Sequence, residues 1–431
     1  MSFSQQIFTF GAANPLLLDQ LLAPANEVLS NFVRGVTSEG PLNDFRFLRL
    51  GVHRLLSQCA SGRDFLQQLH NLHDQPIARA TFFDALHSER RNRILAELNT
   101  QLVLRRASQL PDLLQGFPAL AKYQIFAIDG HHLAHSVHAA RDEKGDHVSA
   151  NSLYAMNLRT GVLANLGSVQ GEGVRRHEMP VFRRQLGPWL LRQTDRRGPP
   201  TICVVDPGFV DNRFWLEMLA APRPALLITR TKSNMRPIVL GECPWERSAE
   251  INQGVVADEF ISFDGRNRMR RVRYVDPESG EAFDFLTTVM DLAPGLIALL
   301  YLLRWRIEKV FDTSKNKLEE VKAWATGEVA QEMQAHFFAL THNLLLLLRQ
   351  KLNAEHGIRE EKVERKREAA MTRRQEKATQ HGRTVARFQE KLPAIVQLTA
   401  QFIRALRNGI IRALRWTAAL SHFRKAMKAY L

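Results

Sequence analysis

The chain has few cysteines: among its 431 residues only Cys59, Cys203 and Cys243 occur, far apart in the sequence. They form neither a CxxC pair nor a disulfide framework, which favours a reducing compartment. Residues 1–24 lack the basic segment followed by an apolar stretch that makes a secretory signal. The apolar runs are too short, or too often broken by charge, to span a bilayer. These absences predict a cytoplasmic protein.

Positive charge is in clear excess. The chain has 59 lysines and arginines against 44 aspartates and glutamates, a formal net charge of +15. Hydrophobic residues make up 45% and charged residues 24% of the sequence, which is typical of a folded globular protein. A chain this basic generally binds an anionic partner, and nucleic acid is the first candidate. On charge alone, a ribosomal role or a membrane-surface role stays open.

The residue pattern divides the chain into three regions. Residues 1–118 have a helical pattern and are expected to bind DNA, although a small helical bundle of another role fits equally well. Residues 119–350 contain short apolar runs that alternate with helical segments, and are expected to form an α/β core. Within the core, residues 231–291 have the pattern of short strands and predict a β-rich insertion. Residues 351–431 form a basic helical region, suited to DNA contact or dimerisation.

Two apolar runs of the core end in an aspartate. Residues 123–129 end at Asp129 and residues 200–206 end at Asp206, and a turn residue follows each. Continuous apolar runs suit strands that are buried on both faces of a sheet. The pattern of residues 151–169, between them, is typical of a hairpin. The order strand, hairpin, helix, strand, helix, strand predicts an α/β protein with an RNase H-like core.

A predicted helix over residues 300–315 places four functional side chains on one stripe. Tyr301, Arg304, Glu308 and Lys315 lie at offsets of 0, 3, 7 and 14 residues, within an arc of roughly 60° on a helix. The stripe suits a polyanion that runs along the helix beside one carboxylate. Arg304 and Glu308 are also an i,i+4 pair, common on solvated helix faces and worth about 0.2–0.5 kcal/mol. The opposite side is apolar and comprises Leu303, Ile307, Val310, Phe311 and Leu318.

Three acids from separate elements could support phosphodiester chemistry. Two divalent ions can activate a water molecule, stabilise the transition state and assist the leaving oxygen. Such ions need hard oxygen ligands, which favours carboxylates over thiols and imidazoles. The candidates are Asp129, Asp206 and Glu308. Either aspartate taken alone also suits a turn-capping role, and Asp211 and Asp312 are the nearest rival acids.

These motifs together resemble a known family. The spacing of Tyr, Arg, Glu and Lys over residues 301–315 resembles the YREK signature of the insertion-sequence DDE transposases of the insertion sequence four family. The sequence AIDG at residues 127–130 resembles the strand of their first catalytic aspartate, and VVDPGF at residues 204–209 resembles the second. The family also places a β-rich insertion before the glutamate. The resemblance covers residues 120–350 and does not extend with any specificity to either end of the chain.

The resemblance implies roles for these residues. The three acids are expected to be catalytic and to bind two Mg²⁺ or Mn²⁺ ions, and Tyr301, Arg304 and Lys315 are expected to contact DNA phosphates beside the cleaved end. The implied protein is a DNA transposase, a homodimer on paired element ends, associated with the nucleoid in the bacterial cytoplasm. It would cut with water and then join the freed 3′-hydroxyl to target DNA. The alternatives are a catalytically silent DNA-binding descendant and an RNase H-type nuclease without strand transfer.

A cluster of four histidines and one tryptophan could also have functional roles. His131, His132, His135 and His138 follow the first aspartate. A shared zinc ion is disfavoured, because alternate strand positions face opposite sides and no cysteine is near. Trp245, in the insertion, could hold a flipped base as the resemblance implies, but a core or turn role fits it at least as well.

Overall fold

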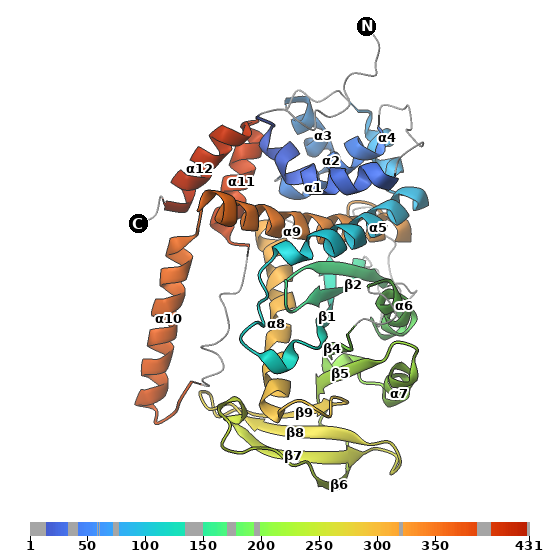
Figure 1. Cartoon of the computed structure of the whole chain (residues 1–431). Helices are drawn as coiled ribbons and strands as arrows, with labels where there is room; N and C mark the ends of the chain where they lie inside the picture. Colours follow the sequence, from blue (N-terminus) through green and yellow to red (C-terminus); the bar gives the residue numbers. More distant parts are fainter. Residues whose placement is uncertain are drawn as a thin grey trace, which may run out of the picture.

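The computed structural model describes residues 14–32, 42–57, 59, 61–71, 77–133, 150–169, 178–193, 199–318, 322–385 and 398–428. A mixed sheet of nine strands runs through the centre of this part of the chain, in the order β3-β2-β1-β4-β5-β9-β8-β7-β6. Figure 1 shows the N-terminal helices at one end of the molecule and β6 at the other. The predicted α/β class, with helices at both ends of the chain, is confirmed.

The first half of the sheet has the topology of an RNase H-like fold. Strand β1 is antiparallel to β2, and β2 is antiparallel to β3. Strands β4 and β5 then continue from the other side of β1, each parallel to its neighbour. The bounds of these strands are β1 (Gln124–Leu133), β2 (Ala150–Asn157), β3 (Leu163–Val169), β4 (Thr201–Val205) and β5 (Ala225–Arg230). The predicted hairpin and both predicted aspartate strands are present.

Strand β1 is central because its alternate residues supply two different hydrophobic clusters. Ile125 and Ala127 pack into the cluster shared with the helices α8 and α9, whereas Phe126 and Ile128 pack with α6 and α7 on the other face. All five residues of β4 are buried, as expected for a strand covered on both sides. The helices named here are α6 (Glu178–Gln193), α7 (Asn212–Ala220), α8 (Pro294–Lys317) and α9 (Glu328–His356).

The β-rich insertion extends the core sheet. Its strands are β6 (Ile238–Glu242), β7 (Val255–Ser262), β8 (Met269–Val275) and β9 (Ala282–Thr287). They pair antiparallel in sequence order, and β9 pairs antiparallel with β5. The strands β7, β8 and β9 were predicted, whereas β6 was not. A buried ion pair between Asp258 and Arg270, with Nε 2.7 Å from Oδ1, joins β7 to β8.

The two terminal regions are helical, as predicted. The N-terminal helices are α1 (Leu17–Phe32), α2 (Asp44–Leu56), α3 (Gly62–Asn71), α4 (Arg79–Ala85) and α5 (Glu89–Arg106). Helix α9 packs between them and β3 (Figure 1). The C-terminal helices are α10 (Glu361–Gln380), α11 (Ala400–Ile411) and α12 (Trp416–Lys428). Within the described ranges, no helix has the length and apolar content needed to cross a membrane.

Candidate active site

Helix α8 carries the predicted stripe and lies against β1, β4 and β5. It begins at Pro294, a residue that suits the first turn because its missing N–H has no helical partner there. Leu303, Ile307 and Phe311 are buried in the main core, as the apolar pattern predicted, and Val310 is partly buried. Because the apolar side of α8 is buried in the core, the polar stripe faces Asp129 of β1 and the C-terminal end of β4.

Arg304 joins two of the predicted acids. Its Nη1 donates to Asp129 Oδ2 at 2.7 Å, and its Nη2 lies 2.9 Å from Glu308 Oε1. Only 5% of the Arg304 side chain is exposed. Burial by itself would lower the pKa of Arg304, but the charges of neighbouring acids, Asp129 foremost, outweigh burial and raise the pKa. The guanidinium is therefore the counter-charge for the acids around it.

The Asp129 carboxylate, in the middle of β1, is largely buried. Burial is the main reason that its pKa rises to about 6, and the charges of Glu178 and Glu308 contribute in the same direction. Arg304 and the Gly130 N–H, 2.9 Å from Oδ1, oppose the rise. A carboxyl group in this setting depends on nearby cations to stay ionised at neutral pH.

Asp206 lies next to Asp129. The parallel register of β1 and β4 pairs Ile128 with Val205, so Asp206, directly after the end of β4, follows the register position beside Asp129 in β1. Asp206 is half-buried and its Oδ1 accepts a hydrogen bond from Gly208 N at 2.8 Å. Its charge is among those that raise the pKa of Arg304. Asp206 therefore both caps the turn that follows β4 and lies near the other acids.

The two rival acids, Asp211 and Asp312, interact with residues other than Arg304. Asp211 caps α7 by accepting from Phe214 N at 3.0 Å, and it forms an ion pair with Arg183. Asp312 is exposed on α8 and lies 3.7 Å from Lys309. Neither rival contacts Arg304 in the described part of the chain, whereas both Asp129 and Glu308 do.

The remaining residues of the stripe differ in exposure. Tyr301 is buried, and its ring centroid lies 5.1 Å from that of Phe285 in β9. Burial is the main reason that its pKa is raised. Lys315 is exposed farther along α8, close enough to His131 and His132 to influence both histidines. Of the four residues of the stripe, only Lys315 is exposed.

Sequence reasoning did not identify Glu178 as part of this site. Glu178 is the first residue of α6, and its Oε1 lies 3.3 Å from His132 Nε2. A Cβ at Gly130 would lie 1.7 Å from the same Oε1, so the glycine leaves room for this carboxylate. The sequence signal that could have pointed to it is the glycine directly after Asp129.

The two described histidines of the cluster face opposite sides of β1. His131 is buried and stacks on Phe311, with ring centroids 4.6 Å apart, and burial is the main reason that its pKa falls to about 3. His132 points the other way, toward Glu178. His135 and His138 lie outside the described residues. Trp245 is half-buried, with the Arg247 guanidinium 5.1 Å from its ring, and its role in DNA binding stays a prediction.

The donor chemistry of the three acids suits Mg²⁺ or Mn²⁺, because all of them offer carboxylate oxygens. In the part of the chain that the structure describes, no three His, Cys, Asp or Glu side chains form a group that could hold a metal ion. The Arg304 guanidinium instead provides the positive charge between Asp129 and Glu308. The guanidinium therefore balances the charge of these two acids as the side chains now lie.

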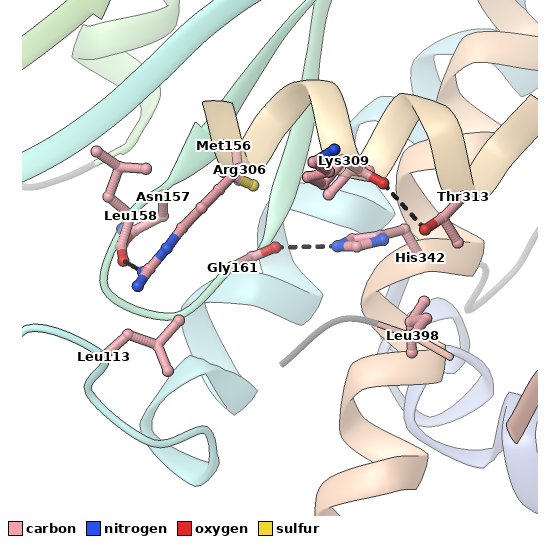
Figure 2. Close-up of a pocket in the computed structure, with 11 residues that line it drawn as sticks. Leu113, Met156, Asn157, Leu158, Gly161, Arg306, Lys309, Thr313, His342 and Leu398 are labelled. Carbon is pink, nitrogen blue, oxygen red and sulfur yellow. Dashed lines mark hydrogen bonds between the residues drawn. The ribbon is translucent and has the colours of Figure 1, made fainter. Parts of the chain in front are cut away.

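A pocket on the opposite side of α8 is separate from the acids. Figure 2 shows it between α8 and the turn that joins β2 to β3, with Arg306, Lys309 and Thr313 contributed by α8. His342 Nε2 lies 3.0 Å from the Gly161 carbonyl oxygen at its edge. Its lining contains no carboxylate side chain.

The sequence and the fold were compared with known proteins. Residues 120–344, just over half of the chain, match the family model of the transposase DDE domain. No curated protein matches the sequence. Among solved structures, a cryo-EM structure of the piggyBac transposase synaptic complex with hairpin DNA is similar, with a TM-score of 0.41 and 13% identity, covering 92% of this chain and 82% of that chain.

Proposed function

The chain belongs to the transposase DDE domain family, and from this membership we propose that it cuts DNA strands at the ends of a mobile element and joins the freed 3′-hydroxyls to target DNA. The observation that carries the proposal is the meeting of two carboxylates, Asp129 and Glu308, on one buried guanidinium, with Asp206 directly after the adjacent strand β4.

The acids are the proposed catalytic and metal-binding residues. We assign Asp129, Asp206 and Glu308 to hold two Mg²⁺ or Mn²⁺ ions, which when bound would activate the attacking oxygen and stabilise charge in the transition state. Asp129 lies in β1 and Asp206 directly follows the adjacent buried strand β4, so their backbones are rigidly placed. Glu308 comes from α8, whose apolar side is anchored in the core. The fold thereby fixes the backbone positions of the proposed ligands.

The rest of the stripe is proposed to bind DNA. We place the chain in the insertion sequence four family, with Tyr301, Arg304, Glu308 and Lys315 as its YREK residues. Lys315, exposed on α8, can act as a point charge toward a phosphate beside the cleaved bond. The Arg304 side chain is only 5% exposed, so contact with a phosphate requires the guanidinium to become more accessible. The Tyr301 ring packs in the core, which leaves its hydroxyl as the group for a DNA contact.

The flanking regions are proposed to assist on DNA. We assign residues 1–118 to DNA binding, residues 119–350 to catalysis, and residues 351–431 to DNA contact or dimerisation. The net charge of +15 supports contact with the DNA backbone. A homodimer on two element ends, at the nucleoid in the cytoplasm, completes the proposal.

The test compares the wild-type protein with Glu308→Gln on a DNA fragment that carries the element's own ends, with Mg²⁺ or Mn²⁺. We expect metal-dependent cleavage and joined product from the wild type, and loss of both in the variant with DNA binding retained. Asp312→Asn is the matched control, because Asp312 is an exposed acid one turn farther along α8. It should keep both activities.

The outcomes separate the proposal from its alternatives. DNA binding without cleavage by either protein would indicate a catalytically silent descendant. Cleavage without joined product would indicate an RNase H-type nuclease. Cleavage that survives in Glu308→Gln but is lost in Asp312→Asn would show that the third acid is Asp312.

A further inference from the structure

An exposed arginine ends β5, beside the candidate acids. If the parallel registers of β1, β4 and β5 are continued by one position past β4, Asp206 falls between Asp129 of β1 and Arg230, the last residue of β5. Thr229 Oγ1 donates to the Val205 carbonyl oxygen at 2.9 Å, so β5 still lies next to β4 at this level. Two carboxylates and one guanidinium therefore follow one another across three adjacent strands.

These three side chains belong to the face of the sheet that α8 covers. The residues two positions earlier, Ala127, Val204 and Ile228, all pack in the hydrophobic cluster shared with α8. Side chains two positions apart in a strand point to the same face. Asp206 keeps an extended backbone, with φ −66° and ψ 152°, so the alternation continues through it. The arginine and the two acids therefore share one face.

The charge of Arg230 acts on Tyr301 of α8. Burial is the main reason that the pKa of Tyr301 is raised. The positive charges of Arg304 and Arg230 oppose this rise, and the charge of Asp206 adds to it. Lys315 is 14 residues farther along α8, roughly 21 Å at about 1.5 Å rise per residue. The two exposed cations, Arg230 and Lys315, thus lie at opposite ends of the acid cluster.

The Arg230 guanidinium is available to a ligand. It forms no ion pair or side-chain hydrogen bond with the residues that the structure describes. Arg304, in contrast, is bound to Asp129 and Glu308. A guanidinium presents five N–H donors in a planar fork that matches the oxygens of a phosphate. An accessible cation beside two carboxylates also offsets their repulsion of an approaching phosphate.

We propose that Arg230 binds a phosphate of the DNA strand that lies along the acids, at the Tyr301 end of α8, and that Lys315 binds the strand at the other end. The inference rests on the proposed function, because it takes DNA as the substrate of this site. It adds a contact from β5 to those assigned to α8. Contacts from two separate elements hold the strand at two points, which positions the bond to be cut.

DNA binding by the full-length chain tests the contact, using fluorescence anisotropy with a duplex that carries the element's own ends and without divalent metal, so that no strand is cut. Arg230→Ala should raise Kd about fivefold and should reduce the slope of log Kd against log salt concentration by about 0.9, the value of one phosphate contact. Arg230→Lys should keep the slope and recover part of the affinity, because a point charge remains.

The matched control is Arg213→Ala. The Arg213 side chain is 90% exposed on α7, which packs on the other face of the sheet. This variant should change neither Kd nor the salt slope. Circular dichroism establishes that each variant is folded. If Arg230→Ala matches Arg213→Ala in both quantities while the wild type still cuts DNA, the inference fails and the proposed function stands.

Neutral methylphosphonates, placed one at a time near the cleaved end, identify the phosphate. At the position bound by Arg230, the substitution should weaken binding by the wild type but change the Kd of Arg230→Ala by less than about twofold. At positions bound by Lys315, both proteins should lose affinity equally. Equal losses for both proteins at every position would overturn the contact. A wild-type chain that does not bind DNA would overturn this inference together with the proposed function.

Discussion

Arg304 of α8 and Asp129 of β1 form a buried ion pair, with 2.7 Å between Nη1 and Oδ2. Only 5% of the arginine side chain and 18% of the aspartate side chain are exposed. The same guanidinium also lies 2.9 Å from Glu308. Because repulsion between buried carboxylates falls as a cation approaches, this pair both ties α8 to the sheet and balances the acids gathered there.

Removing the guanidinium should therefore destabilise the protein. Arg304→Gln is expected to lower the free energy of unfolding by about 3 kcal/mol, because it leaves a buried carboxylate without its cation. Urea unfolding in metal-free buffer measures this loss. Millimolar Mg²⁺ should recover part of it, because a divalent ion between carboxylates can replace the missing charge.

The control for this variant is Arg213→Gln. The Arg213 side chain is 90% exposed in its pair with Glu217, so its loss should change the stability by less than about 0.5 kcal/mol and should not respond to Mg²⁺. Equal stability of Arg304→Gln and wild type without metal would contradict the role given to Arg304 as counter-charge.

Gly130 and Glu178 should be energetically coupled. Gly130→Ala places a Cβ where Glu178 Oε1 now lies, 1.7 Å away, so the glutamate side chain must move and give up its contact with His132. We expect a loss of about 1–2 kcal/mol in the wild-type background and a clearly smaller loss in a Glu178→Ala background. Thermal or urea unfolding of the four proteins in this cycle provides the coupling energy.

The alternative outcome is that the losses of stability in Gly130→Ala and Glu178→Ala simply add in the double variant. That result would mean that the alanine at position 130 acts on the β1 backbone alone. Gly187→Ala is a suitable reference, because a Cβ at that helical glycine of α6 would meet nothing within 4 Å. That substitution should be neutral or slightly stabilising, since alanine is the better helix former.

The buried ion pair Asp258–Arg270 should stabilise the segment that leads into α8. Arg270 Nη1 donates to the carbonyl oxygens of Val289 and Leu292, at 3.3 and 2.7 Å, directly before α8. Asp258→Asn leaves the buried guanidinium without its anion and should cost about 3–5 kcal/mol. A double change to Asp258→Leu and Arg270→Met should cost much less. A double variant as unstable as Asp258→Asn would show that the carbonyl contacts, rather than the ion pair, carry the stability.

The parts of the fold that were predictable follow from local patterns. The strands β1 and β4 were identified because a strand buried on both faces needs an unbroken apolar run, and each run ends at its aspartate. The helix α8 was identified because its polar stripe and its apolar side both repeat with the period of a helix. These features depend only on residues close in the sequence.

The parts that were missed depend on packing between distant segments. Arg304 and Asp129 are 175 residues apart, and only the placement of α8 on β1 brings them together. Glu178 belongs to no motif, and its relation to Gly130 arises from how α6 approaches the sheet. Strand β6 has only five residues, all exposed, so it lacks the alternation of buried and exposed positions that marks a strand.

The burial of His342 should make the free energy of unfolding depend on pH. It is buried in α9 with Nε2 3.0 Å from the Gly161 carbonyl oxygen, and burial lowers its pKa to about 4 although that hydrogen bond opposes the shift. An exposed histidine in the unfolded chain has a pKa near 6.5. The unfolded state thus binds the proton first, so this contribution is complete above about pH 6.5 and is lost progressively down to about pH 4, by about 3 kcal/mol.

His342→Gln isolates this contribution, because the glutamine amide can still donate to Gly161 but does not titrate. The variant is expected to be less stable than wild type at pH 7.5, where the loss of the packed ring dominates. Its unfolding free energy should then fall less than that of wild type between pH 6.5 and pH 4.5, with about one proton fewer taken up on unfolding. Urea midpoints at a series of pH values measure both slopes. Identical slopes would mean that His342 is protonated as readily in the folded protein as in the unfolded chain, and that the turn at Gly161 is open to water.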